Sequence, residues 1–359
     1  MINSEFWRGK KILLTGHTGF KGSWMSLWLN ELGCTVYGYA LQPESPISLY
    51  KEADVDSIVN SSIADVRDAD TLNNYVKQVQ PDIIFHLAAQ PIVRESFKDP
   101  VATIDTNVMG TVNLLEAARK IDSVKAIVVV TSDKCYDNKE WQWGYRENEA
   151  LGGHDPYSAS KACAELITQC YRLSFMGNTG TDAHQCAVAS ARAGNVIGGG
   201  DWSTDRLIPN IVDSVNNDID VVLRNPSAIR PWQHVLEPVA GYIMLAERLA
   251  TEGHAYAEAW NFGPQDSDAR SVSWITEQLI QLFDSESHWR LDSAQHPHEA
   301  QHLKLDCSKA QNRLNWKPAW SLSECLHEIV VWHQAHAANE DMRKVSLETI
   351  QRYSKKLES

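Results

Sequence analysis

The stretch that decides the fold is Thr15-Gly16-His17-Thr18-Gly19-Phe20-Lys21-Gly22, because of the segments on either side of it. Residues 11–15 read as a short buried strand, and apolar residues recur at helical spacing over residues 23–32. Glycines between a strand and a helix allow a tight turn and let the backbone approach a pyrophosphate at the helix N-terminus. The glycines at 16, 19 and 22 therefore predict a dinucleotide-binding turn.

Further strands alternate with helices along the chain. The expected strands cover residues 35–40, 58–63, 82–87, 126–131 and 185–190, and the expected helices cover residues 69–79, 107–120 and 156–175. Strands that are continuous apolar runs and alternate with helices belong to a parallel sheet covered on both faces. The sequence thus predicts an α/β fold: a doubly wound, Rossmann-type parallel sheet with a smaller α+β substrate-binding domain.

The composition changes after residue 191, where loops rich in Gly, Asn, Pro and Trp begin. We expect residues 1–190 and 236–264 to form the dinucleotide-binding domain, and residues 191–235 and 265–338 to form the substrate domain. Residues 339–359 are charged and are expected to be a C-terminal tail, either an exposed helix or partly disordered.

Bulk properties exclude several classes of function. A net charge of −13 argues against nucleic acid as a general partner. No run of about 18 apolar residues could span a membrane, and the first residues lack the apolar core of a signal peptide. The cysteine count of 7 is odd and no CxxC pair occurs, which favours free thiols and a cytoplasmic location.

A second stretch, Tyr157-Ser158-Ala159-Ser160-Lys161, indicates chemistry. Tyr157 and Lys161 share one face of the expected helix, for which Asp155 is placed as the cap and Pro156 as the first residue. A nearby ammonium favours the phenolate, so we expect a lowered pKa for Tyr157. Combined with a dinucleotide, this pair predicts hydride transfer at an alcohol.

The segment after the strand at 126–131 adds three candidate catalytic residues. It leaves the carboxyl end of a central strand, where open α/β sheets bind their ligands. Ser132 can bond the reacting oxygen, and Asp133 and Lys134 are two ionisable groups beside the phenol. We expect these residues to face Tyr157.

Two other features concern cofactor and metal. The acid that usually recognises the ribose of NAD is absent from the end of the second strand, which leaves NAD and NADP open; Asp65 and Val66, after the third strand, suit contacts to adenine. His298 and His302 stand at i, i+4 and could bind a metal if helical. Pro297 breaks that run and no further ligand set is evident, so we expect a solvated loop and no metal.

These residues together resemble the extended short-chain dehydrogenases/reductases over nearly the whole chain. The resemblance is carried by the glycine turn, His86-Leu87-Ala88-Ala89-Gln90, Asn107, Tyr157 with Lys161, Arg192-Ala193-Gly194-Asn195-Val196 and Asn315-Trp316-Lys317-Pro318. Within that family the chain resembles the nucleotide-sugar 4,6-dehydratases, which have Thr or Ser, then Asp, then usually Glu at positions 132–134. Lys134, the segment 19–22 and Gly199-Gly200-Asp201-Trp202 are most similar to the branch that acts on CDP-glucose.

The resemblance implies NAD as cofactor and a nucleotide sugar as substrate. The implied cofactor residues are Gly16, Gly19, Phe20, Lys21, Gly22, Asp65, Val66, Leu87, Ala88, Ala89, Gln90, Asn107, Tyr157 and Lys161. The implied substrate residues are Asn195, Arg206 and Arg230, the last two as cations for phosphate. A homodimer or dimer of dimers through residues 107–120 and 156–175 is also implied.

The implied reaction has three stages. Tyr157 takes the proton of the sugar 4-hydroxyl while hydride passes from C4 to NAD, and Lys161 orients the nicotinamide ribose and tunes Tyr157. Lys134 removes the C5 proton and Asp133 protonates the departing 6-hydroxyl. Hydride then returns to C6, so NAD ends as it began.

One step in this scheme depends on the charge of Lys134. Burial, Lys161 and the nicotinamide charge would lower its pKa and make it a base, whereas Asp133 would raise the pKa. We expect burial, Lys161 and the nicotinamide charge to prevail, so that the pKa of Lys134 is lowered. Two other functions stay open on this fold: a 4-epimerase, which has no use for Asp133 and Lys134, and a cofactor sensor, which has no use for a proton-transfer set.

Overall fold

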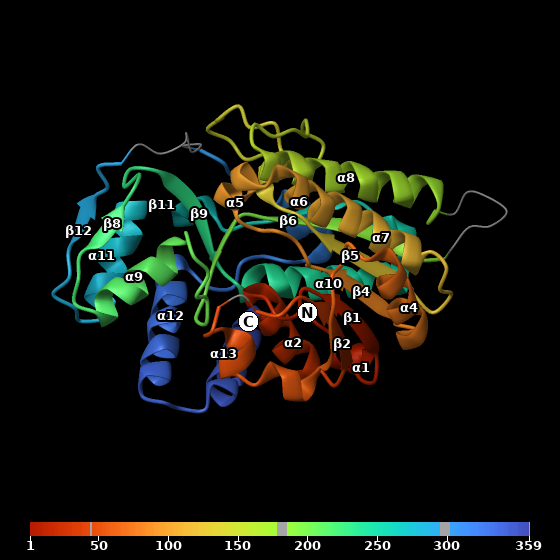
Figure 1. Cartoon of the computed structure of the whole chain (residues 1–359), viewed down its shortest axis with the longest axis horizontal. Helices are drawn as coiled ribbons and strands as arrows, with labels where there is room; N and C mark the ends of the chain where they lie inside the picture. Colours follow the sequence, from red (N-terminus) through yellow and green to blue (C-terminus); the bar gives the residue numbers. More distant parts are fainter. Residues whose placement is uncertain (44, 178–184, 295–301, 359) are drawn as a thin grey trace.

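The computed structural model describes residues 1–43, 45–177, 185–294 and 302–358. A seven-stranded sheet, in the order β10-β6-β5-β4-β1-β2-β3, forms its centre, and every neighbouring pair is parallel (Figure 1). The strands are β1 (Lys11–Thr15), β2 (Thr35–Ala40), β3 (Asn60–Ile63), β4 (Ile83–His86), β5 (Ala126–Val130), β6 (Ala187–Ala193) and β10 (Ala259–Phe262). This confirms the predicted Rossmann-type sheet.

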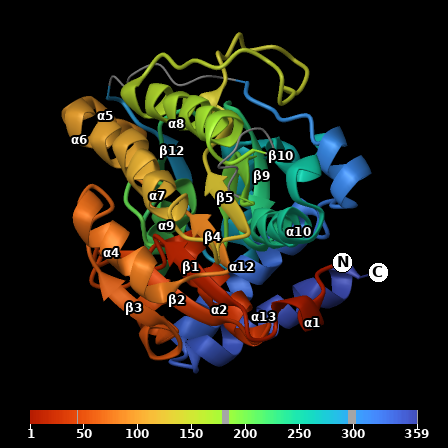
Figure 2. The same ribbon diagram turned by 90° about the vertical axis from the view of Figure 1, so that its right-hand side faces the viewer.

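Helices cover both faces of this sheet (Figure 2). One face packs against α4 (Ala69–Val79), α7 (Gly110–Ala118) and α8 (Pro156–Ser174), and the other against α2 (Phe20–Glu31) and α10 (Leu236–Glu252). Successive strand residues point to opposite faces, so Leu13 enters the first core and Ile12 and Leu14 enter the second. The continuous apolar runs of the strands follow from this double burial.

Three elements depart from their expected bounds. The third strand begins at Asn60, because the preceding residues, Val55–Ile58, form a 3-10 turn. The helix expected at 107–120 is interrupted: α6 (Pro100–Ile104) leads into a π-helical segment (Asp105–Met109), and α7 follows. Strand β6 continues past the expected end at 190 to Ala193, which carries its last residues into the site.

A second, smaller group of elements lies beyond the carboxyl edge of the sheet (Figure 1). Its sheet, β11-β9-β7, is made of β7 (Asn195–Ile197), β9 (Ile229–His234) and β11 (Ala269–Ser271), and β8 (Val221–Leu223) pairs with β12 (Trp289–Leu291). The helices with it are α9 (Leu207–Asn216), α11 (Val272–Leu282) and α12 (Leu322–Ala337). The short helices α1 (Ser4–Trp7), α3 (Leu49–Glu52) and α5 (Val93–Lys98) complete the chain. The domain boundaries given above remain our proposal.

The C-terminal residues are not an exposed tail, so that expectation is wrong. Helix α13 (Met342–Leu357) packs against α2 and α12, and the two chain ends lie side by side (Figures 1 and 2). Its apolar residues recur at helical spacing and are buried, although the charges between them hide this pattern: Met342, Val345, Ile350 and Tyr353. The Tyr353 hydroxyl donates to Oε2 of buried Glu237 at 2.5 Å.

Two further expectations can be compared with the structure. All 7 cysteines fall within the described residues and none is paired, as predicted. In the described ranges, every helix is too short or too polar to cross a membrane.

The contact between α13 and α10 predicts a pH-dependent stability. Burial raises the pKa of Glu237 from 4.5 to about 7. A raised carboxyl pKa contributes stability that is complete below the unfolded value and is lost as the pH rises through the folded value. The Tyr353 hydroxyl bond lowers this pKa and so favours the ionised carboxylate. Tyr353→Phe should therefore cost about 1–3 kcal/mol of unfolding free energy, with the larger loss above pH 7.

Urea unfolding of the variant at about pH 5 and pH 8 measures this difference. Tyr75→Phe is the matched control, because the Tyr75 hydroxyl donates only to the backbone carbonyls of Gly38 and Asn60. Its cost should be the same at both pH values. Equal losses for Tyr353→Phe at the two pH values would contradict the assigned role of Glu237.

Candidate active site

The glycine turn between β1 and α2 is as tight as the sequence predicts. Gly16 has φ +77°, and a Cβ there would lie 2.7 Å from the Ala88 backbone nitrogen. A Cβ on Gly22 would lie 2.1 Å from the Gly16 carbonyl oxygen. Gly19 is the N-cap of α2, with no comparable clash, and leaves the helix N-terminus open to a phosphate. Two glycines thus close the turn and the third exposes its donors.

The loop after β4 is held against helix α8 by Asn107. Its Oδ1 accepts from the Gln90 backbone nitrogen at 2.8 Å, and its Nδ2 donates to the Gln90 carbonyl at 3.1 Å and to Ser160 Oγ at 2.8 Å. Asn107 reaches these partners from the π-helical segment, a distortion common at functional sites. Asn107 therefore ties the end of this loop to α8 at the residue before Lys161. The cofactor roles of residues 87–90 stay a prediction. Ser160 was not singled out from the sequence.

Asp65 and Val66 follow β3. The Asp65 carboxylate forms an ion pair with Arg67 at 2.6 Å, which holds the pKa of Asp65 below its usual value. Val66 packs closely against Gly110 at the start of α7. The carboxylate of Asp65 is therefore already engaged, and its backbone carbonyl accepts from the Tyr39 hydroxyl at 3.1 Å. The contact to adenine stays a prediction.

Tyr157 and Lys161 lie at the N-terminal end of α8 and are both buried. Asp155 caps the helix by accepting from the Ser158 nitrogen at 2.9 Å. The Lys161 ammonium lies 3.4 Å from the Val130 carbonyl, and burial lowers its pKa to about 8. Burial also raises the pKa of Tyr157, against the opposing effects of the Lys134 charge and a Ser132 hydrogen bond. The expectation of a lowered Tyr157 pKa is therefore wrong for the protein alone.

The loop that follows β5, residues 131–136, places Ser132, Asp133 and Lys134 beside this phenol; we name it the catalytic loop. Ser132 Oγ donates to Asp133 Oδ1 at 3.0 Å and accepts from the Lys134 nitrogen at 3.2 Å. Lys134 Nζ lies 3.7 Å from Asp133 Oδ1. The Asp133 charge raises the pKa of Lys134, which outweighs burial and the Arg230 charge. The expected lowering of this pKa is wrong, because the nearest carboxylate prevails and keeps the ammonium charged.

Lys21 points into the same cluster. Its Nζ donates to the Tyr242 hydroxyl of α10 at 3.3 Å. Burial, followed by the charges of Arg206 and Lys161, lowers the pKa of Lys21 to about 7, while Asp133 opposes them. Sequence reasoning placed Lys21 in the cofactor turn but missed Tyr242, because no motif in α10 marks it.

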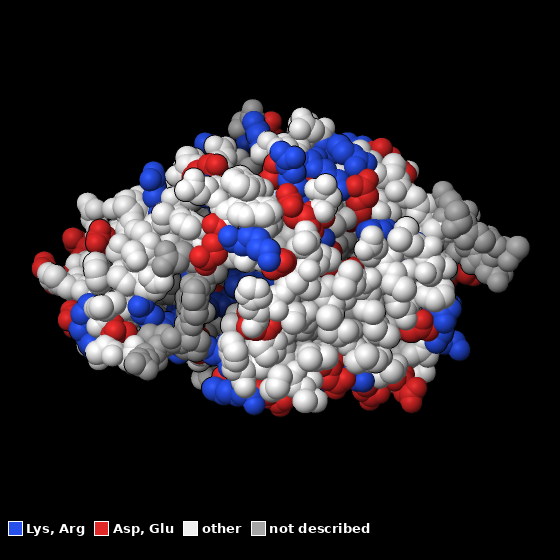
Figure 3. Space-filling model, turned by 90° about the horizontal axis from the view of Figure 1, so that it is seen from above, with Lys and Arg blue, Asp and Glu red and all other residues white. Residues whose placement is uncertain are grey.

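The three expected substrate residues lie on the second group of elements. Asn195 begins β7, Arg206 caps α9 and pairs with Asp201 at 2.9 Å, and Arg230 lies on β9. Arg206 lowers the pKa of Tyr157, and Arg230 lowers that of Lys134, so both cations lie near the reacting groups. The molecule is hollowed on this side, with basic atoms inside the hollow (Figure 3).

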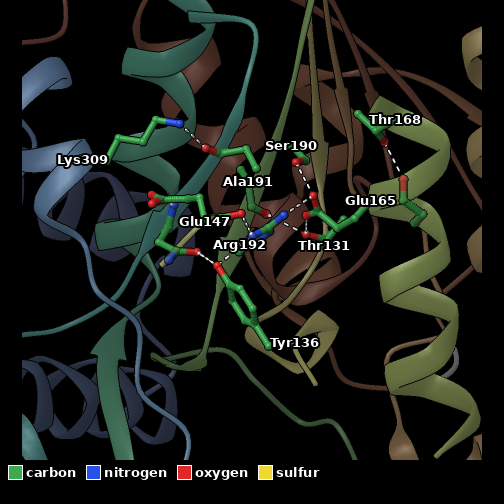
Figure 4. Close-up of polar contacts among 12 residues, drawn as sticks. Thr131, Tyr136, Glu147, Glu165, Thr168, Ser190, Ala191, Arg192 and Lys309 are labelled. Carbon is green, nitrogen blue, oxygen red and sulfur yellow. Dashed lines mark hydrogen bonds and ion pairs between the residues drawn. The ribbon is translucent and has the colours of Figure 1, made fainter. Parts of the chain in front are cut away.

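Sequence reasoning also missed a buried network behind the catalytic loop (Figure 4). Arg192 of β6 and Glu165 of α8 form an ion pair of 2.8 Å, and both side chains are almost wholly buried. A carboxylate one helical turn after Lys161, on the same helix face, was the signal that could have identified it.

Of the two histidines considered as metal ligands, His298 lies outside the described residues. Within the described residues, no group of three or more His, Cys, Asp or Glu side chains could hold a metal ion. The phenol, ammonium, hydroxyl and carboxylate groups of the site suit proton transfer beside a dinucleotide.

Known proteins share these features. The profile of the family described as GDP-mannose 4,6 dehydratase matches residues 13–329. The chain is 52% identical over 353 residues to the CDP-glucose 4,6-dehydratase of Salmonella typhimurium, covering 98% of each protein.

Two solved structures show the same fold. One is the dTDP-glucose 4,6-dehydratase of Bacillus anthracis in complex with NAD, with TM-score 0.75 and 21% identity, covering 93% of this chain and 100% of that one. The other is the UDP-glucose 4-epimerase of Thermotoga maritima with UDP-glucose, with TM-score 0.77 and 20% identity, covering 91% and 99%. At such low identity they show the fold alone.

Proposed function

Because the chain belongs to the GDP-mannose 4,6-dehydratase family of extended short-chain dehydrogenases/reductases, we propose that it is an NAD-dependent nucleotide-sugar 4,6-dehydratase acting on CDP-glucose. The product is CDP-4-keto-6-deoxyglucose, and water is the only by-product. The observation that carries this function is the 52% identity to a CDP-glucose 4,6-dehydratase over 98% of the chain. Asp133 and Lys134 beside Tyr157 disfavour a 4-epimerase, which performs no elimination.

The residues of the glycine turn fit NAD. Gly16 and Gly22 occupy positions where any Cβ would meet backbone, and Gly19 leaves the N-terminus of α2 open for the pyrophosphate. Asn107 fixes the loop 87–90, and Lys161 is placed to bond the nicotinamide ribose. The chemistry that NAD supplies when bound is reversible hydride transfer, out of C4 of the sugar and later back to C6.

Tyr157 starts the reaction by accepting the proton of the sugar 4-hydroxyl. Its phenolate is costly because it is buried, and the Lys134 charge and the Ser132 hydrogen bond offset that cost. Arg206 acts in the same direction, so an arginine that we assign to the substrate also favours the phenolate. Loss of hydride from C4 leaves a 4-ketone, which acidifies the C5 hydrogen.

Asp133 and Lys134 carry the elimination. Lys134 remains an ammonium next to Asp133, so it is suited to stabilise the enolate oxygen that forms when the C5 proton leaves. The Asp133 carboxylate takes the C5 proton and passes it to the departing 6-hydroxyl, which leaves as water. The leaving group thus gains the proton that was removed from C5. Once the hydride is back on C6, C5 takes up a proton from solvent and Tyr157 releases the proton that it accepted, so the net change is the loss of one water.

The quaternary structure we propose is a two-fold dimer, or a dimer of such dimers. Leu114 and Leu115 of α7, which we expected at the contact, are buried in the core of the subunit. The exposed apolar side chains lie instead on α6 and α8, which pack together: Val101 and Ile104 on α6, and Leu166 and Leu173 on α8. An apolar face outside the core is a natural contact for a second copy.

Two further proposals concern the cellular location of the enzyme and the pathway that its product supplies. All 7 cysteines are free, which suits a reducing cytoplasm. A 4-keto-6-deoxy sugar nucleotide is a precursor of deoxysugars, and we assign the enzyme to the supply of such sugars for the O-antigen of lipopolysaccharide.

The first test is product formation. Incubation with catalytic NAD and a panel of CDP-, dTDP-, GDP- and UDP-hexoses should convert CDP-glucose alone to a product lighter by one water, as measured by mass spectrometry. NADH absorbance should not accumulate, because the hydride is returned. Steady accumulation of NADH would indicate a net dehydrogenase instead, and recovery of a 4-epimer of unchanged mass would indicate an epimerase.

The second test separates a base from an electrostatic role for Lys134. Lys134→Met removes a charge that lowers the Tyr157 pKa, so the acidic limb of the pH–rate profile should move to higher pH, and kcat should fall about 100-fold. Lys134→Arg keeps the charge but cannot act as a base. It should retain C5 hydrogen exchange with deuterated water and the pH profile of the wild type.

The control for this pair is Lys139→Met, which removes a surface lysine paired with Asp137 and should leave the pH profile unchanged. Loss of C5 exchange in Lys134→Arg, with C4 oxidation retained, would return Lys134 to the role of base.

The third test concerns the dimer. Replacing Leu166 and Leu173 together by Asp should give a monomer in analytical ultracentrifugation at micromolar concentration, because two charges would be buried at the contact. Leu291→Asp, on the equally exposed strand β12, is the control and should leave the dimer intact. A wild-type protein that sediments as a monomer would refute this proposal.

A further inference from the structure

Two residues that flank the segment 132–134 are hydrogen-bonded to the same buried ion pair. Thr131 precedes the segment and Tyr136 closely follows it. The Thr131 hydroxyl donates to Glu165 at 2.5 Å, and Arg192 donates to the Tyr136 hydroxyl at 2.7 Å. Glu165 and Arg192 are themselves paired at 2.8 Å (Figure 4). Both ends of the segment are therefore tied to the same pair of charges.

Both oxygens of the Glu165 carboxylate accept hydrogen bonds. Oε1 accepts from Thr131, and Oε2 accepts from Ser190 Oγ at 2.6 Å and from Arg192 Nη2 at 2.8 Å. Glu165 lies on α8, one turn after Lys161, whereas Thr131 and Ser190 stand on or beside the neighbouring strands β5 and β6. One carboxylate thus fixes the distance between the helix that carries Tyr157 and the strand end that carries the loop.

Arg192 makes the second connection. Its Nη1 donates to the Tyr136 hydroxyl and to the Glu147 carbonyl at 3.1 Å, and the guanidinium lies 4.8 Å from the Tyr136 ring centroid. The Tyr136 hydroxyl donates in turn to Asn261 Oδ1 of β10 at 2.8 Å. The end of the loop is therefore held from β6 and from the edge strand β10.

A gain in folding stability does not explain the buried ion pair of Glu165 and Arg192. Removing two charges from water costs several kcal/mol for each ion, and apolar replacements of a buried pair are often as stable or more so. What the pair adds here is geometric: its four bonds go to Thr131 and Tyr136 at the two ends of one loop, to Ser190 of β6 and to the Glu147 carbonyl.

We propose that Glu165 and Arg192 are positioning residues for the dehydration, holding Ser132, Asp133 and Lys134 in place against Tyr157 through Thr131 and Tyr136. This rests on the proposed dehydratase function. Neither Glu165 nor Arg192 reaches the substrate in this role. They act on rate through the loop, because small displacements of reacting groups from their productive geometry cost about 100-fold in rate.

Conservative variants of Thr131 and Tyr136, which connect the loop to the ion pair, test the proposal without leaving Arg192 unpaired. Thr131→Val and Tyr136→Phe each remove one hydroxyl and keep the shape. Each should lower kcat for CDP-glucose about 10-fold or more, with KM within about twofold, because the substrate cations are not on the loop. Thr131→Ser restores the hydroxyl and should recover kcat to within about threefold.

Two controls on the same helix carry the same chemical changes. Thr168→Val removes a buried hydroxyl that donates to the Ala164 carbonyl at 2.7 Å, and Tyr171→Phe removes one that donates to Glu116 at 2.7 Å. Neither hydroxyl is bonded to Glu165 or Arg192, and Figure 4 shows the Thr168 bond apart from the ion pair. Both should keep the wild-type kcat per folded molecule, with folding measured by thermal unfolding.

The outcomes are distinct. If Thr131→Val and Tyr136→Phe keep the wild-type kcat, or lose it only in proportion to folded protein as the controls do, the positioning role is wrong. If Thr131→Ser fails to recover kcat, the hydroxyl bond to Glu165 is not the cause. A wild-type protein that converts none of the nucleotide hexoses would instead refute the proposed function, and thermal unfolding would show that it is folded.

Discussion

The buried carboxylate of Glu165 is the interaction on which the geometry of the site depends. It joins helix α8, which carries Tyr157 and Lys161, to the ends of β5 and β6. A buried charge persists only when it is paired and hydrogen-bonded, and Arg192 together with two hydroxyls meets this requirement here. The helix and the strand ends consequently cannot shift independently, which is the rigidity that a preorganised proton-transfer site requires.

Burial, rather than charge pairing alone, sets the protonation of this site. It lowers the pKa of Lys161 to about 8 and of Lys21 to about 7, and it raises that of Tyr157. Lys134 is the exception, because Asp133 lies 3.7 Å away and holds its charge. An acidic protein thus concentrates several cationic groups in one hollow, where a dianionic nucleotide sugar would be bound.

The sequence predicts the features that depend on local pattern. The glycine turn, the parallel sheet and the Tyr157–Lys161 face follow from spacing, because strand and helix periods are local properties. The buried face of α13, the Lys21–Tyr242 contact and the partners of Arg192 follow from residues far apart in the chain. The pKa of Lys134 differs from these, because its main partner, Asp133, is the adjacent residue. The direction of its shift depends on the balance between the Asp133 charge and burial, and the spacing of residues does not reveal which prevails.

Lysine at position 134 also changes how the two chemical stages are linked. A carboxylate there would place a second negative charge beside Asp133, and like charges near a phenol disfavour its ionisation. With Lys134, the pair of Asp133 and Lys134 has no net charge. Of the two charges, that of Lys134 has the larger effect on Tyr157, and it lowers the pKa of the phenol. The same ammonium that favours proton removal from the 4-hydroxyl is then available to the enolate oxygen at C4. In the proposed reaction, one side chain therefore serves oxidation and elimination in turn without changing its own charge.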